Sequence, residues 1–202
     1  MPHHASDSNE HFNKLNNALA RFVSLTAEQA DALHETATLR RYEKNDCFVR
    51  QGEICHQVGF LIQGVFRVFH LHADKEISNY FNTENRNPFV SSFASFLGNV
   101  QSKETVVALE DSDMLVVDKK DLLKLYDRYH TFERLGRLMA EYNYLLALQR
   151  IEQLQYNPAA ARYQDFLKTY PNLINRIPHH YVASYLGVTP ESLSRIRNER
   201  TH

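Results

Sequence analysis

The sequence predicts an α+β protein with an N-terminal antiparallel β-roll, or jelly roll, a long helix, and a C-terminal all-α domain containing a helix-turn-helix. Three observations support this fold class. After Leu39, short runs rich in Val, Phe, Tyr and Ile alternate with turn residues. From about residue 131 to 156, apolar residues recur at spacings of three and four. Residues 177–202 then give two short helical patterns joined by a glycine.

Length and composition favour two small domains in one chain. The 202 residues, 43% of them hydrophobic, provide ample material for cores. We expect a loose polar tail over 1–12, the β-roll with flanking helices over 13–130, the long helix and a hinge over 131–157, and the helix-turn-helix domain over 158–202. The opening residues lack the apolar run of a secretory signal, and no stretch approaches the length of a membrane span, so no membrane association is expected.

The two cysteines, Cys47 and Cys55, do not make a disulfide framework, which favours a reduced, cytoplasmic location. The net charge of −1 at first argues against a nucleic-acid partner. From Pro158 onward, however, six Lys or Arg stand against three Asp or Glu, a balance of +3, while the remainder carries −4. The basic excess therefore coincides with the predicted helix-turn-helix.

The N-terminal half begins with helical spacing from Leu15 to Ala37, with Thr26 as the cap of a second short helix. Six strands are then predicted, and the runs that define them are residues 47–49, 58–62, 65–71, 77–81, 106–109 and 114–117. Between the fourth and fifth strands, residues 82–104 are too long for a simple hairpin and have helical character over 89–97. An insertion of this size in a barrel is usually functional.

After a short helix over 122–126, the long helix carries an apolar stripe too long for a small barrel to cover. The stripe favours pairing with a second copy of the chain, and packing against the C-terminal domain of the same chain is the alternative. The residues predicted for this dimer contact are Leu135, Leu138, Tyr142, Leu145 and Ile151. Asn157 and Pro158 break the helix and form the expected hinge, before a helix over 159–170.

The helix-turn-helix pattern begins with Pro178 in a first helical turn. Gly187 supplies the chain reversal, and Thr189 is the predicted N-cap of the second helix. Leu193 and Ile196 point inward, which leaves a polar outer face. That face comprises Glu191, Ser192, Ser194, Arg195 and Asn198, with Arg197 and Arg200 nearby. Such a face predicts double-stranded DNA as the partner, although an arginine-rich helix is also often only a solvated surface.

The order of β-roll, long helix and helix-turn-helix resembles the Crp/Fnr family of bacterial transcription regulators, which have a cyclic-nucleotide-binding-like domain. The matching segments are YEKNDCFVRQGE at 42–53, VGFLIQGVFRVF at 58–69 and TPESLSRI at 189–196. Gly52 and Gly64 match the tight turns of the family. Asn45 stands where a glycine is usual, and Asn tolerates the same left-handed backbone conformation.

The resemblance implies a homodimer that binds a palindromic operator, with RNA polymerase as a further partner. It places Glu191 and Arg195 at base edges, where arginine suits guanine and glutamate suits the cytosine amino group. Ser192, Ser194, Arg197 and Arg200 are implied to meet phosphates. The chain ends at His202, so we expect no full wing after the recognition helix, which reduces the expected affinity.

The sequence departs from the family in the segment that holds a cyclic nucleotide. Nucleotide-responsive members carry Phe-x-Gly-Glu and then Arg-Ser/Thr-Ala; here Ser91 and Ser92 take the Gly-Glu positions, and Ser102 and Lys103 take the Arg-Ser positions. A serine cannot neutralise a buried phosphate, and an unpaired buried charge costs several kcal/mol. Control by cyclic AMP is therefore not expected, and Lys103 would restore it only by turning inward.

Other cofactors lack their ligands. Two cysteines are too few for an iron–sulfur cluster, and His70 and His72 share a strand face without an evident third metal ligand. We therefore expect no cofactor and no metal, and an effector, if one exists, is unknown. The residues predicted to line its pocket are Tyr80, Phe81, Phe89, Ser91, Ser92, Phe93, Ser102 and Lys103. The aromatic members would equally serve as core residues.

The sequence thus predicts a dimeric DNA-binding regulator. A small-molecule-binding or protein-interaction module of the same fold, with weak or lost DNA binding, is the alternative. An enzyme is not expected, because the sequence shows no nucleophile–base motif, phosphate loop or metal triad.

Overall fold

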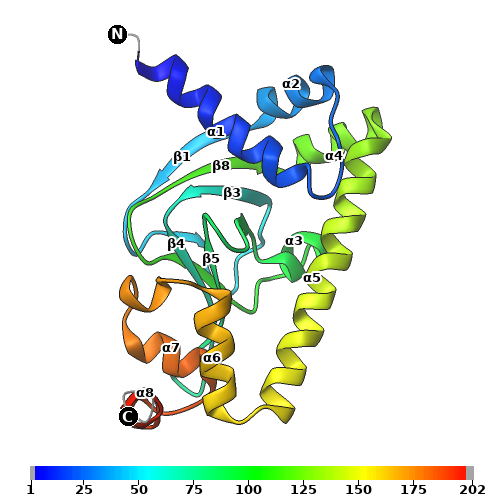
Figure 1. Ribbon diagram of the computed structural model, residues 1–202. Coiled ribbons are helices and arrows are strands. Elements are labelled where there is room, and N and C mark those ends of the chain that lie inside the picture. The colour runs from blue at the N-terminus through cyan, green and yellow to red at the C-terminus, as the bar shows by residue number, and fades with distance from the viewer. Residues whose placement is uncertain (1–2, 199–202) are drawn as a thin grey trace.

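The computed structural model of the chain describes residues 3–198 and has the predicted fold class (Figure 1). Two N-terminal helices come first, α1 (His3–Leu19) and α2 (Ala27–Thr36). The Thr26 hydroxyl accepts a hydrogen bond from the backbone N–H of Gln29, and the Gln29 side chain accepts one from the backbone N–H of Thr26. This capping box confirms Thr26 as the helix start.

The loose tail expected over residues 1–12 is corrected, because residues 3–12 belong to α1. The ring of Phe12 stacks on that of His34 in α2, with 4.1 Å between centroids. Leu15 and Leu19 are buried one turn and two turns further along. These contacts anchor the helix, and the polar composition of its first turns concealed it.

Within residues 3–198, eight strands form two antiparallel four-stranded sheets. The first sheet has the order β1 (Thr38–Tyr42), β8 (Ser112–Asp118), β3 (Gln57–Gln63) and β6 (Phe89–Val90), and the second has β2 (Cys47–Val49), β7 (Thr105–Ala108), β4 (Val65–His72) and β5 (Lys75–Thr83). All six predicted strands are present. The sequence missed β1 and β6, because β1 is largely exposed and pairs only with β8, and β6 has two residues.

Two turns between these strands require residues that tolerate a positive φ. Asn45 has φ of 77°, the left-handed conformation expected where Asn replaces Gly. Gly64 has φ of 121°, and a Cβ there would lie 2.1 Å from the Ser112 hydroxyl oxygen. A side chain at position 64 would therefore clash with β8 as well as strain the turn.

The helices after the β-roll are α4 (Lys119–Arg128), α5 (His130–Tyr156), α6 (Ala159–Thr169), a 3-10 turn η1 (Leu173–Asn175), α7 (His179–Leu186) and α8 (Pro190–Asn198), and α3 (Phe93–Gly98) lies in the insertion. Helix α5 runs along one side of the molecule, and α6–α8 form a separate group at one end of the β-roll (Figure 1). No helix within residues 3–198 has the length and apolarity needed to cross a membrane.

Candidate nucleic-acid interface

The turn between α7 and α8 forms as the sequence predicts. Gly187 has φ of 67°, and its backbone N–H donates to the carbonyls of Ala183 and Ser184. The Val188 N–H donates to the Ala183 carbonyl at 3.0 Å. These bonds satisfy the free carbonyls at the end of α7 and turn the chain into α8. Pro178 immediately precedes the first helical residue of α7 rather than lying within the first turn.

Helix α8 is held by its cap and its inner face. The Thr189 hydroxyl accepts the backbone N–H of Ser192 at 3.2 Å, which confirms Thr189 as the N-cap. Leu193 is 1% exposed and Ile196 packs on the same core. Because these two residues fix one face inward, the opposite face must project outward.

The outward face contains most of the residues predicted to meet DNA. Ser192 is half-buried, and Arg200 lies outside the described residues. The exposed members are Thr189, Glu191, Ser194, Arg195, Arg197 and Asn198. Glu191, Arg195 and Asn198 follow helical spacing along one side of α8, as a row of base-contacting residues requires.

Two charged residues of this face, Glu191 and Arg197, are held by contacts with neighbouring groups. Hydrogen bonds from its own backbone N–H and from the Thr189 hydroxyl, together with the nearby Arg195, lower the pKa of the Glu191 carboxyl. The carboxylate is therefore ionised at neutral pH and acts only as an acceptor. Nη1 of Arg197 lies 2.9 Å from Nδ1 of His179, which links α8 to the first residue of α7.

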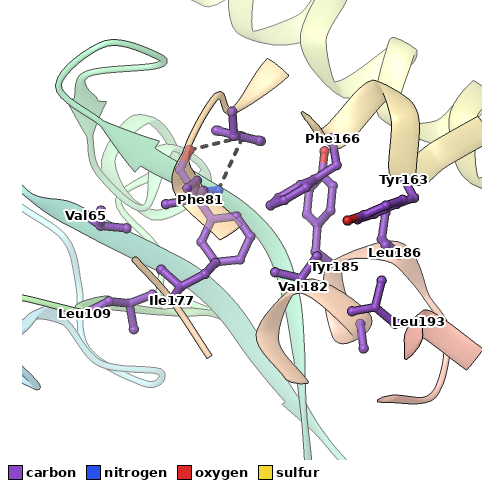
Figure 2. Close-up of a cluster of buried hydrophobic side chains, with 13 residues drawn as sticks. Val65, Phe81, Leu109, Tyr163, Phe166, Ile177, Val182, Tyr185, Leu186 and Leu193 are labelled. Atoms are coloured by element: carbon purple, nitrogen blue, oxygen red, sulfur yellow. Dashed lines mark hydrogen bonds between the residues drawn. The ribbon is translucent and has the colours of Figure 1, made fainter. Parts of the chain in front are cut away.

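A hydrophobic core joins the C-terminal helices to the β-roll (Figure 2). Val65, Phe81 and Leu109 come from the β-roll, and α6, α7 and α8 surround them with Phe166, Tyr185, Leu186, Leu193 and other apolar side chains. Phe81 is completely buried, with ring centroids 6.3 Å from Phe166 and 5.9 Å from Tyr170. The helix-turn-helix is thus docked on its own β-roll.

Polar contacts at the same junction were not foreseen from the sequence. The Ser184 hydroxyl in α7 donates to the Glu76 carbonyl at 2.9 Å and accepts the Ser78 N–H at 3.0 Å, both in β5. Arg67, only 1% exposed, donates to the Ser78 hydroxyl and lies 3.9 Å from the ring centroid of Tyr181 in α7. The contacts of Ser184 and of Tyr181 with the β-roll join residues more than 100 positions apart, so no local pattern reveals them.

Ion pairs of Arg176 hold the loop before α7 on the β-roll. Arg176 donates to both oxygens of Glu84 and to both oxygens of Glu110, and each of these glutamates belongs to a turn of the β-roll. The hydrogen bonds to Glu110 and Glu84 raise the pKa of the guanidinium further above its usual value. The docked arrangement therefore has charged as well as apolar contacts.

The insertion where the resemblance places a cyclic nucleotide is a closed polar network. The hydroxyl oxygens of Ser102 and Ser92 lie 2.9 Å apart, and Ser102 also donates to the Glu104 carbonyl at 2.6 Å. Ser91 donates to the Gln57 carbonyl at 2.9 Å. All three serines are at most 3% exposed. Their hydroxyl groups have hydrogen-bond partners within the chain, and none of the three lines either of the two cavities described below.

The predicted effector pocket is therefore corrected, because its eight residues do not form one site. Phe81 is part of the core beneath the C-terminal helices, and Lys103 is exposed. Phe89 lines an apolar cavity of about 290 Å³ under α1 and α5, and Tyr80 lines a different cleft between α5 and the C-terminal helices. Of the eight predicted residues, Phe93 alone borders both. The alternative noted for the aromatics, a role in the core, applies to Phe81.

The five residues predicted for dimer contact also divide into two sets. Leu135 is buried in its own β-roll cluster, Leu138 packs on that cluster, and the Tyr142 ring lies edge-on to Phe22, which corrects their assignment to the outer stripe. Leu145 and Ile151 are 57% and 50% exposed. They share the exposed part of α5 with Tyr144, Leu148 and Leu154.

This architecture defines the class of domain. The β-roll consists of two antiparallel four-stranded sheets with a helical insertion, and a long helix follows it. Residues 39–129 match the family model of the cyclic nucleotide-binding domain. No curated protein sequence matches the chain significantly.

Solved structures, among them proteins described as regulators, share the fold across more than four fifths of the chain. FixK2 from Bradyrhizobium japonicum is 18% identical with a TM-score of 0.70, covering 81% of this chain and 83% of its own. A protein described as a transcriptional regulator of the Crp/Fnr family from Eubacterium rectale is 16% identical with a TM-score of 0.66, covering 85% and 82%. The c-di-GMP responsive regulator CLP from Xanthomonas campestris is 14% identical with a TM-score of 0.64, covering 87% and 92%.

Proposed function

We propose that this chain is a dimeric transcription regulator of the Crp/Fnr type that binds palindromic DNA through α8. The observation that carries the proposal is the outer face of α8, where Glu191, Arg195 and Asn198 are exposed on a helix anchored by Leu193. Arginine can donate two hydrogen bonds to guanine in the major groove, and Glu191 can accept from cytosine. The shared fold with solved regulators supports this assignment.

A second copy of the chain completes the proposed interface. The exposed half of α5 presents Tyr144, Leu145, Leu148, Ile151 and Leu154, an apolar stripe of the kind that pairs two helices. Pairing along this stripe would relate two copies of α8 by two-fold symmetry, which a palindromic operator requires. We expect the protein to act in the cytoplasm, with RNA polymerase as its further partner.

We also propose that cyclic AMP does not control this regulator. Within the described residues, Ser91, Ser92 and Ser102 are bonded to one another, to backbone carbonyls, to the Cys55 sulfur or to the Glu104 carboxyl, and none of these hydrogen bonds involves an arginine. A cyclic phosphate placed there would displace satisfied hydrogen bonds and leave its own charge without a cation.

The test of DNA recognition is binding of the full chain to operator and random duplexes, measured by fluorescence anisotropy across a salt series. Operator sequences would come from selection on genomic fragments. Arg195→Ala is expected to weaken operator binding by about 10- to 100-fold and random binding far less, because a base contact contributes about 1–3 kcal/mol of discrimination.

Arg134→Ala is the matched control, since Arg134 is an exposed arginine on α5, distant in sequence from α8. It is expected to leave both affinities unchanged. Equal losses on operator and random DNA for Arg195→Ala would contradict its role at base edges.

A further inference from the structure

A deep cleft lies between α5, the end of β5 and the C-terminal helices. Its volume is about 700 Å³, within the range of small-molecule sites. Phe93, Tyr80, Tyr170 and Tyr185 supply aromatic walls, and Arg86 and Arg150 supply positive charge. The cleft is separate from the serine network of the β-roll, because none of Ser91, Ser92 and Ser102 lines it.

Arg150 is the unusual residue of this cleft. Its guanidinium donates to the Tyr185 carbonyl and lies 3.8 Å from the centroid of the Tyr185 ring. Nη1 is buried and has no hydrogen-bond partner among the described residues. Within residues 3–198, no carboxylate forms an ion pair with Arg150. A desolvated cation with an unmet donor is costly unless an anion compensates it.

No aspartate or glutamate is among the described residues that line the cleft. Burial lowers the pKa of Arg150; the nearby Tyr185 and Tyr170 oppose this shift, and the positive charge of Arg162 adds to it. Burial raises the pKa of the Tyr170 and Tyr185 hydroxyls, so both stay neutral. The Tyr170 hydroxyl donates to the Phe81 carbonyl, so this residue contributes its ring to the cleft. The walls are therefore poorly hydrated, and charge interactions across them are stronger than at an open surface.

We propose that this cleft binds an anionic aromatic small molecule, with its negative group paired with Arg150 and Arg86 and its ring against the tyrosines and Phe93. The aromatic walls suit a planar ring, and the two guanidiniums suit a carboxylate or phosphate group. Such a ligand would touch α5 through Arg150 and α7 through Tyr185. It would therefore stabilise the docked position of the helix-turn-helix on the β-roll.

The test is isothermal titration calorimetry of the full chain at low salt with phenyl phosphate as the probe. Inorganic phosphate and phenol carry the charge and the ring separately. Phenyl phosphate is expected to bind at least about tenfold more tightly than either, because only it satisfies both parts of the cleft. The assay contains no DNA, so its outcome is independent of the proposed DNA binding.

Arg150→Gln is expected to weaken phenyl phosphate by at least about tenfold, since a charge-assisted contact is lost. Arg134→Gln is the matched control on the same helix and should bind as the wild type does. Thermal melting would show whether Arg150→Gln is folded, and Arg86→Gln provides a second variant with the same expected direction. Unchanged affinity in folded Arg150→Gln and Arg86→Gln, or equal binding of inorganic phosphate, would overturn the proposal.

Discussion

The interior of the β-roll and the outer face of α8 differ in the burial and hydrogen bonding of their polar side chains. In the β-roll, Ser91, Ser92 and Ser102 are buried and bonded within the chain. On α8, Glu191 and Arg195 are exposed, with the apolar side of the helix fixed inward. A polar group that is already satisfied stabilises the fold, whereas one held at the surface of a rigid helix is available for recognition.

The difference supports the proposal that the outer face of α8, and not the insertion of the β-roll, is the recognition surface. The match to the cyclic nucleotide-binding domain covers residues 39–129, yet the polar residues of its insertion serve local structure. Substitutions in the two regions should therefore separate cleanly. Changes inside the β-roll should alter the free energy of unfolding, and changes on α8 or on the proposed pairing face of α5 should alter DNA affinity.

The largest effect is expected from breaking the proposed pairing of α5. Leu148→Glu places a charge in the exposed apolar stripe, so the dimer should dissociate and operator affinity should fall about 100-fold or more, because the two half-sites are no longer bound together. Light scattering coupled to gel filtration gives the mass. Leu123→Glu, at a 48% exposed leucine of α4, is the control and should remain dimeric. A dimer of unchanged stability in Leu148→Glu would exclude this stripe as the interface.

A smaller effect is expected inside the β-roll. Ser102→Ala removes the partner of the Ser92 hydroxyl and of the Glu104 backbone, so the free energy of unfolding should fall by about 1–3 kcal/mol. Urea denaturation measures it, with Ser194→Ala on the exposed face of α8 as the control expected to show no loss. DNA affinity of folded Ser102→Ala should equal that of the wild type. A selective loss of DNA affinity would show that the two regions are coupled.

The smallest effect concerns the pH dependence of stability. Burial raises the pKa of the Glu104 carboxyl, against the opposing hydrogen bonds from Ser92 and Asn79 and the charge of His70. The folded state therefore holds its proton more tightly than the unfolded state, and stability falls as pH rises from the ordinary carboxyl pKa through the raised one. Glu104→Gln keeps an acceptor for Asn79 and has no charge to desolvate. Its stability relative to wild type should increase across that interval and level off above it, whereas a difference independent of pH would contradict the assignment.

Local patterns in the sequence predicted most of the fold. Runs of apolar residues predicted six of the eight strands found in residues 3–198. Thr26 and Thr189 predicted two helix starts, and Gly187 predicted the turn of the helix-turn-helix. What local patterns missed was short or polar. Strand β1 presents mainly exposed side chains, and the first turns of α1 are polar although Phe12 and Leu15 anchor the helix.

The candidate site was predictable only where one helix determines it. The exposed face of α8 follows from the inward positions of Leu193 and Ile196. The effector pocket was misplaced because the aromatic residues of β5 and of the insertion divide between the core under the C-terminal helices and two different cavities, and only tertiary packing decides which. The role of Arg150 depends on its approach to Tyr185, 35 positions away, which helical spacing on α5 alone does not specify.

The central claim, that α8 recognises a defined operator, is tested most directly by selecting bound fragments from the host genome with purified wild-type protein and Arg195→Ala, at physiological salt and without added ligand. The wild type should recover an inverted repeat with half-sites about one helical turn apart, and Arg195→Ala should lose that motif. Recovery of no motif by the dimeric, folded wild type, both alone and with phenyl phosphate present, would contradict the account.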